Sequence, residues 1–136
     1  MRDPVKIHRI LDVQQQLHRI EEWRLADLDR TLLALAASEQ ELIRALNEDD
    51  ALQGLFIDAM ARRLASIAEQ AARVGEEKTA QEQRLLEHAA RKLCAERLAQ
   101  AVDREVAQAA DKRTLLDAIE RFIAPAAQAS RKIAGP

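Results

Sequence analysis

The stretch LADLDRTLLALAASEQELIRAL, residues 25–46, decides the fold. Six of its seven leucines, together with Glu39, recur in alternating steps of three and four residues. This spacing puts them on one stripe of an α-helix and is typical of a coiled-coil seam. The stripe includes one polar residue, Glu39, and six leucines: Leu25, Leu28, Leu32, Leu35, Leu42 and Leu46. A helix with such a stripe buries it against another helix, so the stretch predicts a helical partner elsewhere in the chain or in another chain.

The first helix is predicted over about residues 4–47. Asp3 is a good helix cap, and proline is well tolerated in the first helical turn, where Pro4 stands. Upstream of the leucine stripe, Val13, Leu17 and Ile20 keep the alternation but join it through an extra step of four, which predicts a local unwinding of the supercoil. The residues Asn-Glu-Asp-Asp at 47–50 favour a turn, because short polar side chains bond to nearby backbone.

A second helix is predicted over about residues 51–124, with a flexible tail at 125–136 after Pro125. Gly75 is the one credible interruption, and we expect a continuous helix with a possible bend there, because a glycine costs only about 1 kcal/mol in a helix interior. The predicted seam alternates steps of three and four through Met60, Leu64, Ile67, Ala71, Val74, Lys78, Gln81, Leu85, His88, Lys92, Ala95, Ala99, Val102, Val106, Ala109, Arg113 and Leu116.

The composition indicates an all-α protein with a single helical-hairpin domain, residues 1–136. The apolar share is mostly Ala and Leu, with one Trp, two Phe and no Tyr, and such a composition is typical of long helices and coiled coils. At about 1.5 Å per residue the helices would be roughly 65 and 110 Å long. The second helix of this antiparallel two-helix coiled coil therefore extends beyond the first.

The residues contain no constellation that predicts an enzyme, and we expect no cofactor and no metal site. His8 and His18 are predicted at the surface and His88 in the seam, without metal-ligand spacing among them. The formal net charge is −2 and no basic stripe is visible, which argues against nucleic acid as a partner. No signal sequence or membrane span is apparent and the one cysteine, Cys94, has no partner for a disulfide, so a cytoplasmic location is expected.

Two apolar clusters are candidate protein-binding sites. The first lies at the end of the second helix, beyond the reach of the first helix, and consists of Leu116, Ile119, Phe122 and Ile123 with the flanking Arg113 and Arg121. The second follows the predicted turn and consists of Leu55, Phe56 and Ile57. Trp23 lies outside the leucine stripe, and we expect it to pack locally against the partner helix, with exposure as the alternative.

The chain resembles the FliJ and YscO family, the small central-stalk proteins of flagellar and type III protein export. The resemblance is carried by Ile7–Leu46 in the first helix and by Arg84–Phe122 in the second, in particular by KLCAERL at 92–98 and DKRTLLD at 111–117. It implies a non-catalytic stalk for protein transport, with the terminal ends contacting a hexameric export ATPase and the region near the turn contacting the export gate. It also implies a place beside a membrane-embedded secretion apparatus.

Two other classes of protein explain the same residues. A homo-oligomeric structural or adaptor coiled coil would bury the end of the second helix against another copy of itself. A secretion chaperone is the other alternative. The residues alone do not choose between a flagellum and a type III injectisome.

Overall fold

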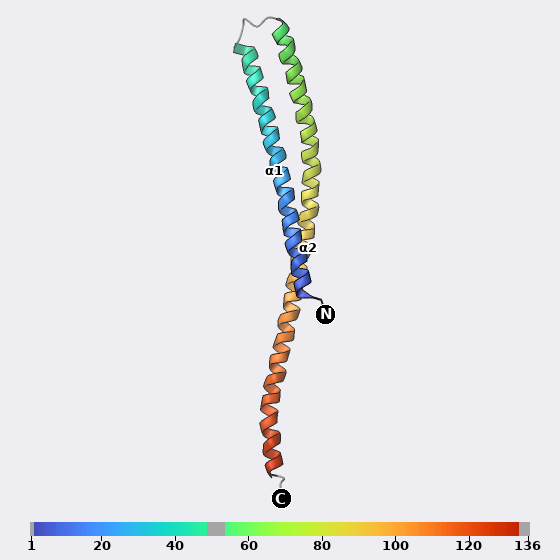
Figure 1. Ribbon diagram of the computed structural model, residues 1–136, viewed down its shortest axis with the longest axis vertical. Helices are drawn as coiled ribbons and strands as arrows, with labels where there is room; N and C mark the ends of the chain where they lie inside the picture. Colours follow the sequence, from blue (N-terminus) through green and yellow to red (C-terminus); the bar gives the residue numbers. More distant parts are fainter. Residues whose placement is uncertain (1, 49–53, 134–136) are drawn as a thin grey trace. The chain divides into compact units, whose positions relative to one another are not determined.

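The computed structural model describes residues 2–48 and 54–133, with side chains placed for 2–48 and 56–126. These residues form two α-helices and no strand: α1 spans Pro4–Glu48 and α2 spans Gly54–Ile133 (Figure 1). The predicted all-α hairpin with a longer second helix is confirmed. At the start of α1, the carboxylate of Asp3 accepts a hydrogen bond from the backbone N–H of Val5 at 3.0 Å, which caps the helix as expected.

The predicted turn lies mostly outside the described residues. Asn47 and Glu48 form the last residues of α1, so this helix ends one residue beyond its predicted limit. Asp49, Asp50 and Ala51 fall outside the part of the chain that the structure describes. The turn at 49–50 and a start of the second helix at residue 51 therefore stay predictions.

The predicted tail after residue 124 is wrong over residues 125–133, because α2 continues through Pro125 to Ile133. A proline in a helix interior lacks the N–H that would bond to the fourth residue before it, which costs about 3 kcal/mol relative to alanine. Its fixed φ nevertheless suits a helix. The neighbouring Ala124, Ala126 and Ala127 are the strongest helix formers, which offsets part of that cost. Residues 134–136 lie outside the described chain.

Gly75 does not interrupt α2, in agreement with the continuous helix that was predicted. It has no positive φ, and it lies within the helix Gly54–Ile133. The hydroxyl of Thr79 donates to the carbonyl oxygen of Gly75 at 3.1 Å. The bond joins residues one helical turn apart, so it fits an unbroken helix.

The chain divides into two compact units. The turn unit comprises Val13–Leu93, and the terminal unit comprises Met1–Asp12 together with Cys94–Pro136. In each of them α1 and α2 run antiparallel (Figure 1). In the turn unit Glu21 contacts Gln81 and Asp29 contacts Lys78, so residue numbers rise along α1 as they fall along α2.

The seam predicted for α2 is confirmed residue by residue from Met60 to Val102, all of whose members are buried or half-buried. The most deeply buried apolar residues are Ile67 in the turn unit and Ala95, Ala99 and Val102 in the terminal unit. Because three of these four are alanine or valine, the helices of the terminal unit can approach closely. Beyond Val102 the seam ends, since Val106, Arg113 and Leu116 are exposed.

The upstream seam of α1 differs from the prediction. Val13 and Ile20 are exposed, as is Ile10, whereas Leu17 is half-buried as predicted. The other buried or half-buried positions include Ile7, Leu11, Gln14, His18 and Glu21. These continue the alternation of steps of four and three backwards from Leu25 without any insertion, so the predicted unwinding of the supercoil is not needed. Further along α1, Glu39 was predicted to lie in the seam but is exposed, and its neighbour Ser38 is half-buried instead.

Candidate functional site

The end of α2 presents a continuous apolar face. Its members are between 43% and 83% exposed: Leu115, Leu116, Ile119, Phe122 and Ile123. Steps of three and four residues place them within about 60° on either side of Ile119 on the helix. We call this set the 115–123 face. Arg113 and Arg121, which were predicted to accompany it, are exposed as well.

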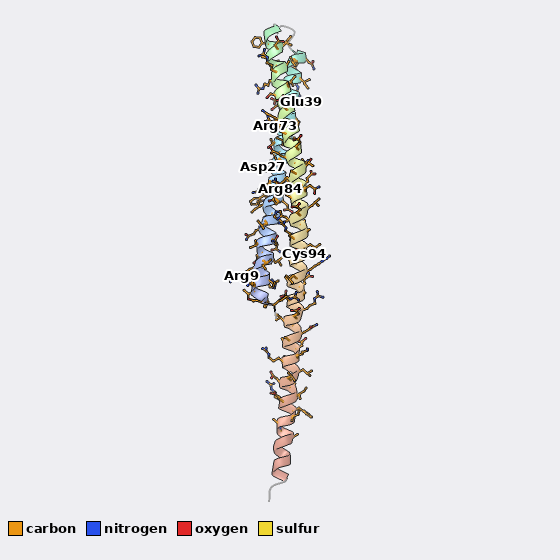
Figure 2. All side chains as sticks on the ribbon, turned by 90° about the vertical axis from the view of Figure 1, so that its right-hand side faces the viewer. Arg9, Asp27, Glu39, Arg73, Arg84 and Cys94 are labelled. Atoms are coloured by element: carbon orange, nitrogen blue, oxygen red, sulfur yellow. The ribbon has the colours of Figure 1, made fainter. Side chains whose placement is uncertain are left out.

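This face has no intramolecular partner in the terminal unit, because the start of α1 reaches along α2 only as far as Glu105. The guanidinium of Arg2 pairs with the carboxylate of Glu105. His8 Nε2 lies 2.8 Å from Asp103 Oδ1. From Asp103 to Ala126 every described side chain is exposed except the half-buried Ala109. Figure 2 shows that the part of α2 beyond the start of α1 carries its side chains with no second helix beside it.

The second predicted cluster lies in the first turn of α2. Phe56 and Ile57 are both exposed, whereas the side chain of Leu55 lies outside the described residues. Consecutive helical residues point about 100° apart, so Phe56 and Ile57 cover a broad arc at the start of the helix. The described part of this cluster can thus contact another protein.

A third apolar surface was not predicted as a site. Val13, Ile20 and Trp23 are exposed on α1, and Trp23 is 68% exposed, so the expectation that it packs against the partner helix is wrong. Ile20 and Trp23 line a shallow hollow of about 500 Å³ together with Arg24, Asp27 and Arg30. Val13 and Ile20 are seven residues apart, and Ile20 and Trp23 are three apart, so all three lie on one face of α1. That face is outside the seam when the seam continues backwards from Leu25 in regular steps of four and three.

A buried polar layer joins the two helices within the turn unit. Glu21 and Gln81 are almost fully buried. The side-chain amide of Gln81 donates to the Glu21 carboxylate and, at 3.1 Å, to the Glu21 backbone carbonyl oxygen. The other carboxylate oxygen of Glu21 accepts from Arg24 at 2.9 Å. Both carboxylate oxygens are therefore occupied.

Three further polar side chains flank this layer. His88 Nε2 lies 3.9 Å from a carboxylate oxygen of Glu21. His88 is half-buried in the seam, as predicted. His18 Nδ1 lies 3.3 Å from Glu22, but the His18 side chain is only 17% exposed, so the prediction that it lies at the surface is wrong. Among the buried side-chain nitrogen and oxygen atoms of the described residues, Nδ1 of His88 and Oε1 of Gln14 have no hydrogen-bond partner. The arrangement fixes the register of the two helices, because a shift would leave a buried carboxylate unpaired.

A charged groove runs beside the polar layer. It has a volume of about 400 Å³ and is lined by alternating charges, Arg24, Asp27, Glu77 and Arg84, above Leu28, Ala80 and Gln81. Figure 2 labels Asp27 on α1 and Arg84 on α2 at this level. Since acids and bases are interleaved, the groove has no excess of one sign that would select a charged ligand.

The described residues contain neither a metal-binding cluster nor a membrane-spanning segment. Within 2–48 and 54–133, no group of three or more His, Cys, Asp or Glu residues is placed to hold a metal ion. Neither α1 nor α2, as far as they are described, contains a segment apolar enough to cross a membrane.

Comparison with protein-family models, with characterised proteins and with solved structures finds no match to this chain. A functional interpretation therefore depends on the exposed surfaces described above and on the resemblance of the two helical segments.

Proposed function

We propose that this chain is a non-catalytic coiled-coil stalk that binds partner proteins through the end of α2, in the manner of the FliJ and YscO family. The observation that carries the proposal is the 115–123 face, an amphipathic helix surface with five large apolar side chains exposed to solvent. An exposed apolar patch of this kind on a protein usually marks an interaction site.

The chemistry of the face suits a groove or ring with an acidic rim. Amphipathic helices bind apolar grooves through side chains three and four residues apart, as in Leu116, Ile119 and Ile123. Arg113 lies beside the face and is exposed, so it can pair with acidic groups at the edge of the partner. Arg121 is also exposed, but it follows Ile119 by two residues and therefore lies on the opposite side of the helix, so the prediction that it flanks the face is wrong. In a central-stalk protein this partner is the ring of the export ATPase.

The described part of the second cluster supports a second contact. Phe56 and Ile57 lie in the first turn of α2, and the residues between α1 and α2 in the sequence immediately precede them. In the FliJ and YscO family the region near the turn would contact the export gate. Two separate binding surfaces on one hairpin are what a linker between ATPase and gate requires.

The test is the affinity of the purified chain for a purified hexameric export ATPase, flagellar or type III. The triple variant Leu116→Ser, Ile119→Ser, Ile123→Ser should bind at least tenfold more weakly while its helical circular-dichroism signal and melting temperature stay near those of the parent. The control is Leu86→Ser, Leu93→Ser, which removes two exposed leucines of the turn unit and should bind normally. Binding by the triple variant at parental strength would contradict the proposal.

The gate contact needs its own measurement. Phe56→Ser, Ile57→Ser should leave ATPase affinity unchanged and weaken binding to the isolated cytoplasmic part of the export gate. If this variant loses ATPase binding instead, the assignment of the two surfaces to two partners is wrong.

A further inference from the structure

The 115–123 face is symmetric about Ile119. Its four other members lie three and four residues before Ile119 and three and four residues after it: Leu115, Leu116, Phe122 and Ile123. When two identical helices pair antiparallel around a twofold axis, a residue before the axis faces a residue equally far after it. With the axis at Ile119, Leu115 faces Ile123 of the partner subunit, and Leu116 faces Phe122 of the partner subunit. Every apolar residue of the face thus meets an apolar residue.

The charges beside the face agree with this pairing. Arg113, Leu116, Glu120 and Ile123 follow one another in steps of three and four, so they lie along one flank. In an antiparallel pair this flank adjoins the same flank of the other helix, as equivalent flanking positions do in antiparallel coiled coils. Arg113 then lies about five residues, or about 7.5 Å along the helix, from the level of Glu120 of the partner subunit, a separation that these two long side chains can span, and the reverse pair forms by symmetry. In a parallel pair the flank would adjoin the one that carries Asp111, Leu115, Ala118 and Phe122. Arg113 could then approach Asp111, but Glu120 would meet no opposite charge, whereas the antiparallel pair provides a partner for both residues.

The lengths of the two helices also agree with an antiparallel pair that crosses at Ile119. Glu105 of α2 pairs with Arg2, which lies two residues before the start of α1. It lies as many residues before Ile119 as Ile133, the end of α2, lies after it. The α2 helix of a second copy would therefore end where α1 begins and would not compete with α1 for the same stretch of α2.

We infer that a second copy of this chain covers the 115–123 face, as an antiparallel pair of α2 ends that cross at Ile119. The inference goes beyond the proposed function and does not depend on it. Because the same face is proposed to bind the export ATPase, self-pairing and ATPase binding exclude each other, and the dimer keeps the apolar surface covered until the partner takes it.

The dimer is expected to be weak. The face covers nine residues, about 13 Å of helix, which is a short contact compared with the interfaces of stable dimers. We therefore expect a dimer in reversible equilibrium with the monomer, with a dissociation constant no lower than about micromolar, the weak limit for interfaces of standard size. With so low an affinity of one copy for another, the face stays available to a partner protein that binds it with higher affinity.

Cysteine cross-linking tests the pairing at single residues. Cys94, the one cysteine of the chain, is first changed to Ala, and Ile119→Cys is then oxidised in dilute solution. At the twofold axis the two introduced thiols face each other within the separation of about 7 Å between Cα atoms that a disulfide allows, so this variant should cross-link rapidly. Asp117→Cys, also exposed but on the opposite side of the helix, is the matched control and should cross-link at least tenfold more slowly.

The direction of pairing is tested by mixing two variants. Leu116→Cys mixed with Phe122→Cys should give the mixed dimer faster than either gives its own dimer, whereas a parallel pair would give the reverse and overturn the inference.

The chain with Cys94→Ala alone should show concentration-dependent dimerisation in analytical ultracentrifugation, and adding Ile119→Asp should abolish it. A chain that stays monomeric up to millimolar concentration, with equal cross-linking at residues 117 and 119, also overturns the inference. ATPase affinity is measured separately, so either proposal can fail alone.

Discussion

Replacing Gln81 by leucine should destabilise the hairpin more than replacing Glu21 by leucine, although these two residues contact each other. In Gln81→Leu the buried carboxylate of Glu21 loses the amide that binds one of its oxygens. It keeps a hydrogen bond from Arg24, 2.9 Å from the other oxygen, and the more distant His88 at 3.9 Å. A hydrogen bond to a charged group contributes about 1.5–3 kcal/mol, and leaving a buried charge short of a partner costs at least as much. We expect a loss of about 1.5–3 kcal/mol in the free energy of unfolding.

The reciprocal change, Glu21→Leu, leaves no buried charge behind. The amide of Gln81 keeps its bond to the backbone carbonyl oxygen of residue 21, 3.1 Å away, and Arg24, whose side chain is 60% exposed, returns to water. The loss should stay within about 1 kcal/mol. The double variant Glu21→Leu, Gln81→Leu should be as stable as the parent or more stable, because well-packed apolar residues often replace a buried polar pair without loss.

Urea denaturation followed by far-ultraviolet circular dichroism measures these differences, and the fluorescence of Trp23, two residues from Glu21, reports on the same region. Gln83→Leu is the control, since Gln83 is exposed and the chemical change is identical; it should shift stability by no more than about 0.5 kcal/mol. If Glu21→Leu proves as harmful as Gln81→Leu, or if the double variant is the least stable of the set, the buried carboxylate is not the source of the effect.

Three further changes test other parts of the fold. Gly75→Ala should raise the free energy of unfolding by about 0.5–1 kcal/mol, because an added Cβ meets nothing within 4 Å; a loss of stability would show that α2 is interrupted there. Val102→Ala, at a site only 1% exposed, should cost about 1–2 kcal/mol more than Val106→Ala at a site 42% exposed, and equal melting curves would contradict the assigned end of the seam. The hydrogen bond and charge of Asp29, 2.8 Å from Lys78 Nζ, raise the pKa of Lys78 above its usual 10.5. The stability that this pair contributes is thus present below the unfolded pKa and is lost as the pH rises through the raised one. Lys78→Gln should accordingly lose less stability than the parent above about pH 10, and parallel curves would argue against the pair.

The sequence predicts most of the fold because heptad spacing is a strong local signal. The α2 seam was correct from Met60 to Val102 even where it holds Lys78, Gln81 and His88, because the regular spacing was followed through polar residues. Upstream of Leu25 in α1, the regular spacing and the positions of the apolar residues disagree. There the apolar Val13 and Ile20 suggested a seam, whereas the helix buries Gln14, His18 and Glu21.

The physical reason for that error lies in the opposite helix. A buried glutamate is costly without partners, and Glu21 depends on Gln81 and His88 of α2 in addition to Arg24 of its own helix. Which α2 residues face a given α1 residue depends on the register, and the register is not visible in either helix by itself. For the candidate site, spacing is enough to find the 115–123 face, but the proposal that an export ATPase binds it depends on the resemblance alone.

The end of α2 shows how binding and folding are joined in this molecule. Over residues 106–126 the helix has no second helix beside it, and most helices depend on such packing for their stability. Strong helix formers take the place of packing here, with Ala107, Ala109 and Ala110 before the face and Ala124 and Ala126 after it. They make the segment helical without covering its apolar side. An occupant of the 115–123 face, whether a second copy or an ATPase, therefore meets a helix that is already formed, and less of the binding free energy is lost to ordering the chain.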